Sequence, residues 1–243
     1  MTEYVEYEKD GFKVIYVNDG EKYDVILADF QAGRLEGQLI GSFPERKTWR
    51  VTVKDRSYVI KRVAPVERPI KRHIWEIVVG PNFSRLLRES QKARERGCDF
   101  IPKVYLAAEK RVGLGRIADS WLIAEFVAGE VLPLGQKPAP DSQWLKALGP
   151  LVAKLHGYGL AHGAPHPFNL IKTAQGFGFI DLSFKGPMLV CMASDVLDAY
   201  RKWGVIVPVK GWALKIATKL TFWKYSWHLF RRKLKNRFKK ASK

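Results

Sequence analysis

Short runs of β-branched and aromatic residues, several of them alternating with polar positions, mark the N-terminal quarter of the chain. Such runs predict strands, and we expect them at residues 4–7, 13–17, 25–27, 48–53 and 57–63. The last two runs flank Lys54, Asp55 and Arg56, which is the spacing of a hairpin. The pattern therefore predicts a small antiparallel sheet in this part of the protein.

The apolar spacing changes from strand-like to helical after this segment. Residues 81–97 begin with proline and end with glycine, which favours a helix with those two residues at its ends. Its predicted inward positions are Phe83, Leu86, Leu87 and Ala93. Two further apolar runs, 102–107 and 121–126, predict strands, and the second is apolar enough for a central strand.

The following residues predict a more helical region. A connector rich in proline and glycine covers 130–140, and Asp141 or Ser142 is expected to cap a helix that runs through Leu155. A short strand is predicted at 178–180, and another helical segment from Ser194 through Tyr200. We expect an α+β protein with an N-terminal part at 1–128, a mainly helical part at 129–205 and a tail at 206–243.

The region 162–181 carries the most specific chemical pattern, HGAPHPFNLIKTAQGFGFID. It places an asparagine in a loop and an aspartate after a short strand, which is the layout of a kinase catalytic loop followed by its metal-binding residue. Amide and carboxylate oxygens are hard ligands of the kind that magnesium prefers. The pattern predicts Asn169 and Asp181 as magnesium ligands. A polar turn between two elements is the alternative that this string alone leaves open.

One position departs from the catalytic layout. Ala164 stands where a kinase carries the aspartate that accepts the proton of the substrate hydroxyl. The sequence therefore predicts a phosphotransferase site without its usual base.

Other parts of a nucleotide site are recognisable in the N-terminal part. Lys61 lies in the predicted strand YVIKRV, near the V-A-I-K pattern whose lysine grips the α- and β-phosphates; an exposed strand lysine is the alternative. Glu125 to Val127 follow the apolar strand where a kinase hinge contacts adenine, although a buried strand and a turn would look the same. Residues 40–44 are expected to form a loop, but without a G-x-G-x-x-G pattern. Glu89 is the candidate in the predicted helix for pairing with Lys61, although a surface glutamate on a charged helix is the favoured interpretation.

The composition of the chain indicates the cellular compartment in which the protein works. The chain has 243 residues, of which 47% are hydrophobic, and two cysteines, Cys98 and Cys191, without metal-ligand spacing. We expect both cysteines to be buried and reduced. The start, MTEYVEYEKDGF, resembles neither a signal peptide nor a membrane span. We expect the protein to remain inside the cell.

The formal net charge of +18 is concentrated at the C-terminus, because residues 201–243 contain fourteen Lys and Arg and no Asp or Glu. Residues 211–243 also place large apolar side chains on one helical face: Ile216, Leu220, Trp223, Trp227, Phe230 and Leu234. This pattern predicts a basic amphipathic helix on an anionic membrane surface. Docking of the aromatic stripe on the protein core is an alternative, and nucleic acid is a less favoured anionic partner.

Taken in order, these motifs resemble the lipopolysaccharide core heptose kinases, a family with a two-lobed protein-kinase-like fold that is also similar to the aminoglycoside phosphotransferases. The resemblance covers roughly residues 40–200 and rests on the lysine strand, the apolar hinge strand and the HGxPHPxN loop before Asp181. It implies that His162 braces the catalytic loop and that Lys61, Asn169 and Asp181 bind ATP and magnesium. The implied acceptor is a lipid-linked core oligosaccharide at the cytoplasmic face of the inner membrane.

Two functions remain open at this point. The first is ATP-dependent phosphorylation of a heptose hydroxyl, weakened or abolished by Ala164. The alternative is a pseudokinase or scaffold that binds nucleotide or a partner at the membrane without transferring phosphate.

Overall fold

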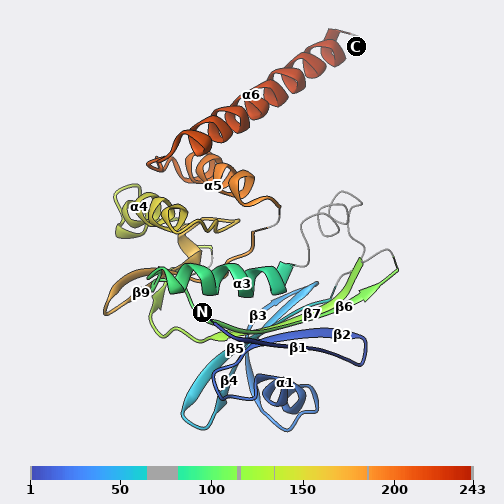
Figure 1. Ribbon diagram of the computed structural model, residues 1–243. Coiled ribbons are helices and arrows are strands. Elements are labelled where there is room, and N and C mark those ends of the chain that lie inside the picture. Colours follow the sequence, from blue (N-terminus) through green and yellow to red (C-terminus); the bar gives the residue numbers. More distant parts are fainter. Residues whose placement is uncertain (1, 65–81, 114–115, 134, 185, 242–243) are drawn as a thin grey trace.

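The computed structural model describes residues 2–64, 82–113, 116–133, 135–184 and 186–241 (Figure 1). A large sheet forms one end of the molecule, with helix α1 on one side of it and helix α3 on the other. The remaining helices lie beyond α3, and the last of them, α6, projects away from the body. The N-terminal sheet and the helical region thus meet near α3.

The sheet contains seven strands in the order β1-β2-β6-β7-β5-β4-β3, and all neighbouring strands are antiparallel. The strands are β1 (Tyr4–Lys9), β2 (Phe12–Val17), β3 (Gly37–Phe43), β4 (Arg46–Val53), β5 (Arg56–Val63), β6 (Val104–Val112) and β7 (Arg116–Glu125). The β4–β5 hairpin turns at the predicted position. The sheet is larger than expected because β6 and β7 lie in its middle.

Successive residues of β7 pack on opposite faces of this sheet. Trp121 and Ile123 belong to the hydrophobic cluster that faces α1, while Leu122 and Ala124 belong to the larger cluster that contacts the other helices. This alternation follows from the period of two in a strand. On β5, Ile60 faces α1, so Lys61 faces the helical region.

The strand expected at 25–27 is wrong, because these residues lie within helix α1 (Tyr23–Gln31). Tyr23, Ile26 and Leu27 are buried there, and Phe30 packs against the same cluster. Their spacing of three and four residues forms one helical face. A run of three apolar residues is too short to distinguish a strand from a helix, and the helical spacing appears only when Tyr23 and Phe30 are included.

The loop expected at 40–44 is also wrong over most of its length. Strand β3 continues to Phe43, and only Pro44 and Glu45 separate it from β4. The register shifts between Leu39 and Gly41. An irregular strand of this kind has no clean alternation, which explains why the sequence pattern suggested a loop.

Helix α3 (Asn82–Glu95) confirms the helix predicted for this segment, whose expected first residue, Pro81, lies outside the described part of the chain. Leu86, Leu87 and Ala93 are buried as predicted. Gly97 has a φ of +92°, and the Cys98 amide donates to the Ala93 carbonyl at 3.0 Å. Glycine tolerates this left-handed conformation and so ends the helix.

The C-terminal region combines helices with a small sheet. Helix α4 (Gln143–Gly157) is capped by Ser142, whose Oγ accepts a hydrogen bond from the Leu145 amide at 3.4 Å. Three short strands pair in the order β10-β9-β8, and helix α5 begins six residues before the predicted Ser194. The remaining bounds are β8 (Glu130–Val131), a 3-10 turn at Pro167–Asn169, β9 (Leu170–Thr173), β10 (Gly176–Phe179) and α5 (Met188–Trp203).

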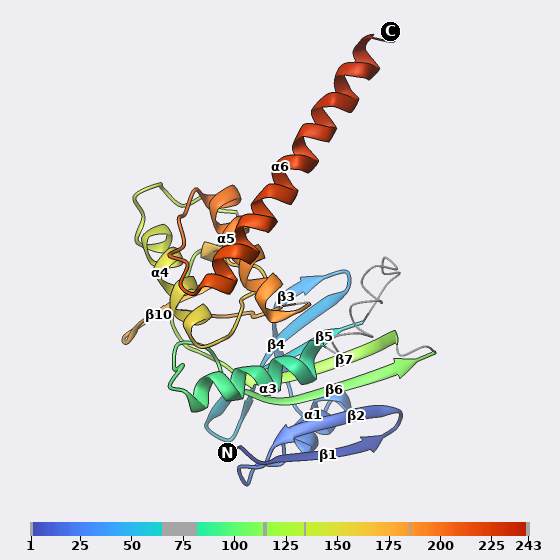
Figure 2. The same cartoon turned by 45° about the horizontal axis from the view of Figure 1, so that its top comes forward.

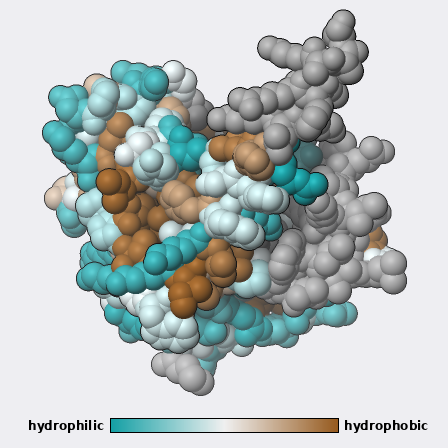
Figure 3. Space-filling model, turned by 90° about the horizontal axis from the view of Figure 1, so that it is seen from above, coloured by the Kyte–Doolittle hydropathy of each residue, from teal (hydrophilic) through white to brown (hydrophobic). Residues whose placement is uncertain are grey.

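Helix α6 (Trp212–Ala241) packs on α5 with one side and leaves its aromatic stripe exposed. Leu214 is buried, and Ala217 and Phe222 contact the core, whereas Trp223 is 68% exposed and Trp227 is 52% exposed. Figure 2 shows the helix leaving the body, and Figure 3 shows apolar side chains beside hydrophilic ones on the upper face of the molecule. The aromatic stripe therefore does not dock on the protein core.

The expected α+β class is confirmed by this combination of an antiparallel sheet and helices. Among the described residues, none of the helices is both long enough and apolar enough to span a membrane. Both cysteines are buried, as expected. The boundaries at 128 and 205 fall between elements, after β7 and after α5, and the division into domains stays a prediction.

Candidate active site

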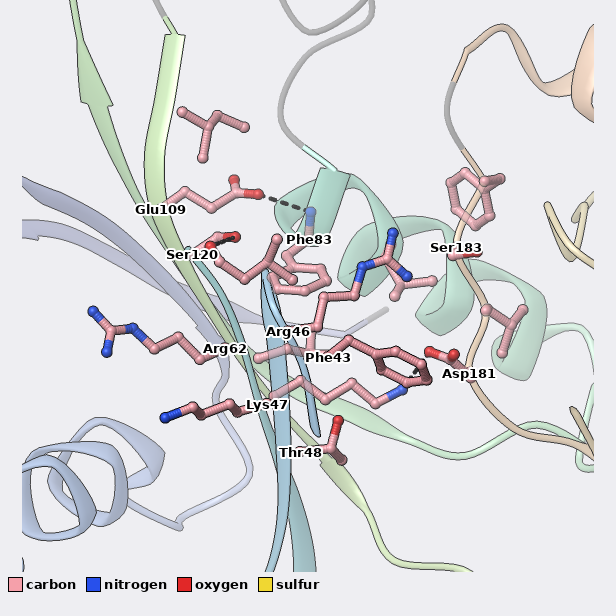
Figure 4. Close-up of a pocket in the computed structure, with 17 residues that line it drawn as sticks. Phe43, Arg46, Lys47, Thr48, Arg62, Phe83, Glu109, Ser120, Asp181 and Ser183 are labelled. Atoms are coloured by element: carbon pink, nitrogen blue, oxygen red, sulfur yellow. Dashed lines mark hydrogen bonds and ion pairs between the residues drawn. The ribbon is translucent and has the colours of Figure 1, made fainter. Parts of the chain in front are cut away.

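Lys61 of β5 and Asp181 form an ion pair across the junction between the sheet and the helical region. Lys61 Nζ lies 2.6 Å from Asp181 Oδ1, although the two residues are 120 positions apart. Figure 4 marks this contact by the dashed line at Asp181. The positive charge of Lys61 lowers the pKa of the Asp181 carboxyl. Asp181 is therefore held as a carboxylate, the form that binds a metal ion.

The backbone at Asp181 has a conformation that few residues adopt. Its φ of +58° lies in the left-handed region, which aspartate tolerates better than most other residues. Strand β10 ends at Phe179, and the Ile180 amide donates to the Asn169 carbonyl at 2.8 Å. The chain thus turns sharply at Asp181, directly beside the loop that carries Asn169.

Asn169 is buried and oriented by the loop itself. Its Nδ2 donates to the Ala164 carbonyl at 3.2 Å, and its backbone amide donates to the His166 carbonyl at 2.9 Å. The side-chain amide nitrogen is thus occupied within the loop, while the amide oxygen is the chemically suitable metal ligand. Together with the Asp181 carboxylate, it provides hard oxygen donors that suit magnesium.

His162 is fully buried at the start of this loop. Its ring lies edge-on to Phe179, with centroids 4.5 Å apart, and its Nε2 is 3.2 Å from the Ile180 carbonyl oxygen. Burial lowers the pKa of His162 to about 4, so the imidazole is neutral near pH 7. A neutral ring that donates from Nε2 to Ile180 joins the loop to the segment before Asp181.

Gly163 allows two backbone segments to approach closely. Its φ is +87°, and a Cβ at this position would lie 2.5 Å from the Phe184 backbone nitrogen. A side chain would therefore push the loop away from the segment that follows Asp181. The glycine next to His162 keeps Asn169 and Asp181 within the same small region.

Asp195 of α5 is a site residue that the sequence analysis missed. Its carboxylate accepts hydrogen bonds from the backbone amides of His162 at 2.7 Å and Gly163 at 2.9 Å, and it contacts His156 Nε2 at 3.2 Å. It is only 1% exposed. The available signal was an aspartate between the apolar residues Ala193 and Val196 of the helix, because charged groups are seldom buried unless they are bonded.

Replacing Asp195 should therefore weaken the whole site. We expect Asp195→Ala to lower the free energy of unfolding by about 3 kcal/mol or more, because two buried amides would lose their acceptor. Urea unfolding followed by circular dichroism measures this change. Asp198→Ala is the control: it lies on the same helix and pairs with Lys202 at 2.7 Å near the surface, so we expect a loss below about 1 kcal/mol. Equal losses would contradict the anchoring role of Asp195.

A cavity of about 110 Å³ lies next to the Lys61–Asp181 pair, between β4, β5, β7, α3 and the segment after Asp181. Phe43 and Arg46, from either side of the β3–β4 turn, line it together with Phe83 and Leu86 of α3. At its far side, the buried Glu109 carboxylate accepts hydrogen bonds from the Phe83 amide at 2.8 Å and Ser84 Oγ at 2.6 Å. Burial raises the pKa of Glu109. These bonds hold the start of α3 on the sheet.

The structure does not bring every predicted residue to this cavity. Glu125 and Val127 line a different cavity, and the Glu125 amide donates to the Lys103 carbonyl at 2.8 Å within the sheet. Their role as an adenine hinge stays a prediction. Glu89 is not the partner of Lys61, since it pairs with Lys92 at 3.0 Å. Position 86, on the face of α3 that lines the cavity, is leucine.

A family model described as lipopolysaccharide core biosynthesis protein (WaaY) matches residues 4–240. Among solved structures, a Rio2 kinase–ADP/Mg²⁺–phosphoaspartate complex from Chaetomium thermophilum has a TM-score of 0.45 and 17% identity, covering 89% of this chain and 71% of that one. WaaP in complex with acyl carrier protein has a TM-score of 0.46 and 17% identity, covering 80% of this chain and 82% of that one.

Curated relatives agree with the family model. A lipopolysaccharide core heptose(II) kinase WaaY from Escherichia coli is 25% identical over 201 residues, which are 82% of this chain and 86% of the relative. The protein of the same description from E. coli strain K12 is 26% identical over 196 residues, or 79% and 82% of the two chains. Because the family model matches nearly the whole sequence, the chain belongs to the WaaY family of lipopolysaccharide core biosynthesis proteins.

Proposed function

We propose that this protein is a kinase that transfers the γ-phosphoryl group of ATP to a heptose hydroxyl of the lipopolysaccharide core. The observation that carries the proposal is the 2.6 Å contact between Lys61 and Asp181, next to a loop that presents Asn169. Family membership and the description of its relatives as heptose(II) kinases supply the acceptor class. Together they favour phosphate transfer to a sugar over binding alone.

Each site residue then has a role. Lys61 binds the α- and β-phosphates, and Asn169 and Asp181 hold magnesium, which when bound offsets the negative charge of the phosphates. His162 and Asp195 keep the loop in place. Transfer breaks the bond from the γ-phosphorus to its bridging oxygen and forms a bond to the sugar oxygen, so that ADP leaves. The hydroxyl proton must pass to solvent or to a phosphate oxygen, because Ala164 cannot accept it.

A second candidate function rests on Ala164. Without a carboxylate at this position, the same residues would bind nucleotide and a partner but transfer phosphate slowly or not at all. This pseudokinase function keeps every structural contact described for Lys61, Asp181 and Asn169. The two candidates differ in turnover, and they agree on nucleotide binding.

We also propose that the protein acts at the cytoplasmic face of the inner membrane. The support is the exposed stripe of α6, with Trp223 and Trp227, on a segment whose charged residues are all basic. Aromatic and basic residues on one helix suit the headgroup region of an anionic lipid surface. A lipid-linked core oligosaccharide would then be held close to the site. Nucleic acid is the less favoured partner.

Nucleotide binding can be tested by thermal unfolding. We expect millimolar ATP with magnesium to raise the melting temperature, because a ligand that binds only the folded state stabilises it. Asp181→Asn serves as a control that should reduce this shift, since the carboxylate is the proposed metal ligand. The absence of both a shift and a calorimetric signal for the unaltered protein would reject the kinase site.

A further inference from the structure

The β3–β4 turn has an unusual composition for a phosphate-covering loop. Pairing of the two strands extends to Phe43 and Arg46, so that the turn between them consists of Pro44 and Glu45. Glycine-rich loops hold phosphates with several exposed backbone N–H groups. Here the pairing is tight, and proline has no N–H to offer. The backbone of this turn is therefore poorly suited to bind phosphate.

The residues that directly follow this turn carry positively charged side chains. Arg46 and Lys47 begin strand β4, and neighbouring strand residues point to opposite faces of a sheet. Both residues line the cavity, but Figure 4 shows the Arg46 guanidinium on the side of α3 and Asp181 and the Lys47 ammonium on the opposite side of the strand.

The charge of Arg46 has no counterion in the part of the chain that the structure describes. Lys61 pairs with Asp181 at 2.6 Å, and Arg62 pairs with Asp119 at 3.0 Å, but no ion pair involves Arg46 within the described residues. The aromatic ring of Phe43, from the same turn, lies beside the Lys61–Asp181 pair in Figure 4. A cation next to a bonded lysine and an apolar cover is suited to an anionic ligand.

We propose that Arg46 binds the phosphate chain of the nucleotide, with its guanidinium replacing the backbone amides of a glycine-rich loop. The inference rests on the proposed nucleotide site and adds a phosphate-binding residue to it. Arginine suits this position because its planar group presents several donors that match two phosphate oxygens at once. The ligand class is a nucleoside di- or triphosphate, since a nucleoside without phosphates would leave this contact unmade.

Isothermal titration calorimetry with ATP, ADP and adenosine, each with magnesium, tests this proposal on the full chain. We expect Arg46→Ala to weaken ATP and ADP binding by about tenfold or more, the effect of losing a charged hydrogen bond, and to leave adenosine binding unchanged. Arg46→Lys should retain part of the affinity. Lys47→Ala, the matched control with the same loss of charge, should change ATP affinity less than about twofold, because its ammonium points away.

The outcomes separate this proposal from the one on which it rests. If the unaltered protein binds ATP and Arg46→Ala binds it equally well, Arg46 has no role and the nucleotide site stands. Equal weakening by Arg46→Ala and Lys47→Ala would reduce the effect to overall charge and overturn the proposal. If the unaltered protein binds neither ATP nor ADP, both proposals fail together. Melting temperatures of the variants show whether each is folded, and both positions are exposed enough to tolerate alanine.

Discussion

Replacing Ala164 by aspartate should raise phosphate transfer to a heptose-containing acceptor by at least about tenfold. A positioned base contributes about 10² to 10⁴ in rate, and Lys61, Asn169 and Asp181 are the residues proposed to position the phosphoryl group. The Asn169 side chain donates a hydrogen bond to the backbone carbonyl of residue 164, and a change of side chain at that position retains this carbonyl. Position 164 is only half-buried, which leaves room for a carboxylate. Release of ADP in the presence and absence of acceptor measures the change.

Ala164→Asn is the matched control, because it has the shape of aspartate without a basic carboxylate. We expect it to show no gain in transfer. The aspartate variant should also bind ATP somewhat more weakly, since the new carboxylate would stand near the phosphates and like charges repel. If the aspartate and asparagine variants bind ATP but transfer phosphate at the same rate as the unaltered protein, more than one catalytic group is missing. The pseudokinase function would then be favoured.

Features with local signatures could be predicted from the sequence, while the roles of the site residues stay a prediction. Lys61, Asn169 and Asp181 lie in short strings whose spacing is tied to a chemical task, and the Lys61–Asp181 pair forms in the structure. The helix end at Gly97 and the cap at Ser142 also depend on neighbours in sequence. Such features are set within a few residues, so a single sequence contains the required information.

Features that depend on distant contacts were missed. Asp195 binds the His162 amide from a position 33 residues later, and nothing near Asp195 in the sequence indicates that partner. The strand expected at 25–27 failed because a three-residue apolar run fits a strand and a helix equally well. The seven-stranded sheet exceeds the predicted one because pairing of β2 with β6 joins segments that are far apart in sequence. Sheet size is a tertiary property, and local alternation does not determine it.

Replacing Trp223 and Trp227 together by serine should abolish most binding to anionic vesicles. The two indoles stack with centroids 6.4 Å apart and are both more than half exposed, so they form one apolar surface. Burial of one such side chain contributes about 1.5 kcal/mol or more, and losing two corresponds to about 100-fold in affinity. Leu214, Ala217 and Phe222 still hold α6 on the body, so the variant should remain folded. Co-sedimentation with phosphatidylglycerol vesicles measures the loss.

Tryptophan emission then separates a membrane from a nucleic acid. Vesicles should shift the emission of the unaltered protein to the blue, and the shift should persist at moderate salt because inserted indoles are not held by charge alone. The double variant should lack it, whereas Val25→Ser, which removes an exposed apolar residue of α1 on the opposite side of the sheet, should retain it. RNA binding would instead fall steeply as salt returns counterions to the phosphates. An unshifted spectrum with vesicles, combined with salt-sensitive RNA binding, would assign α6 to nucleic acid, because exposed indoles that meet no lipid remain free to stack on bases.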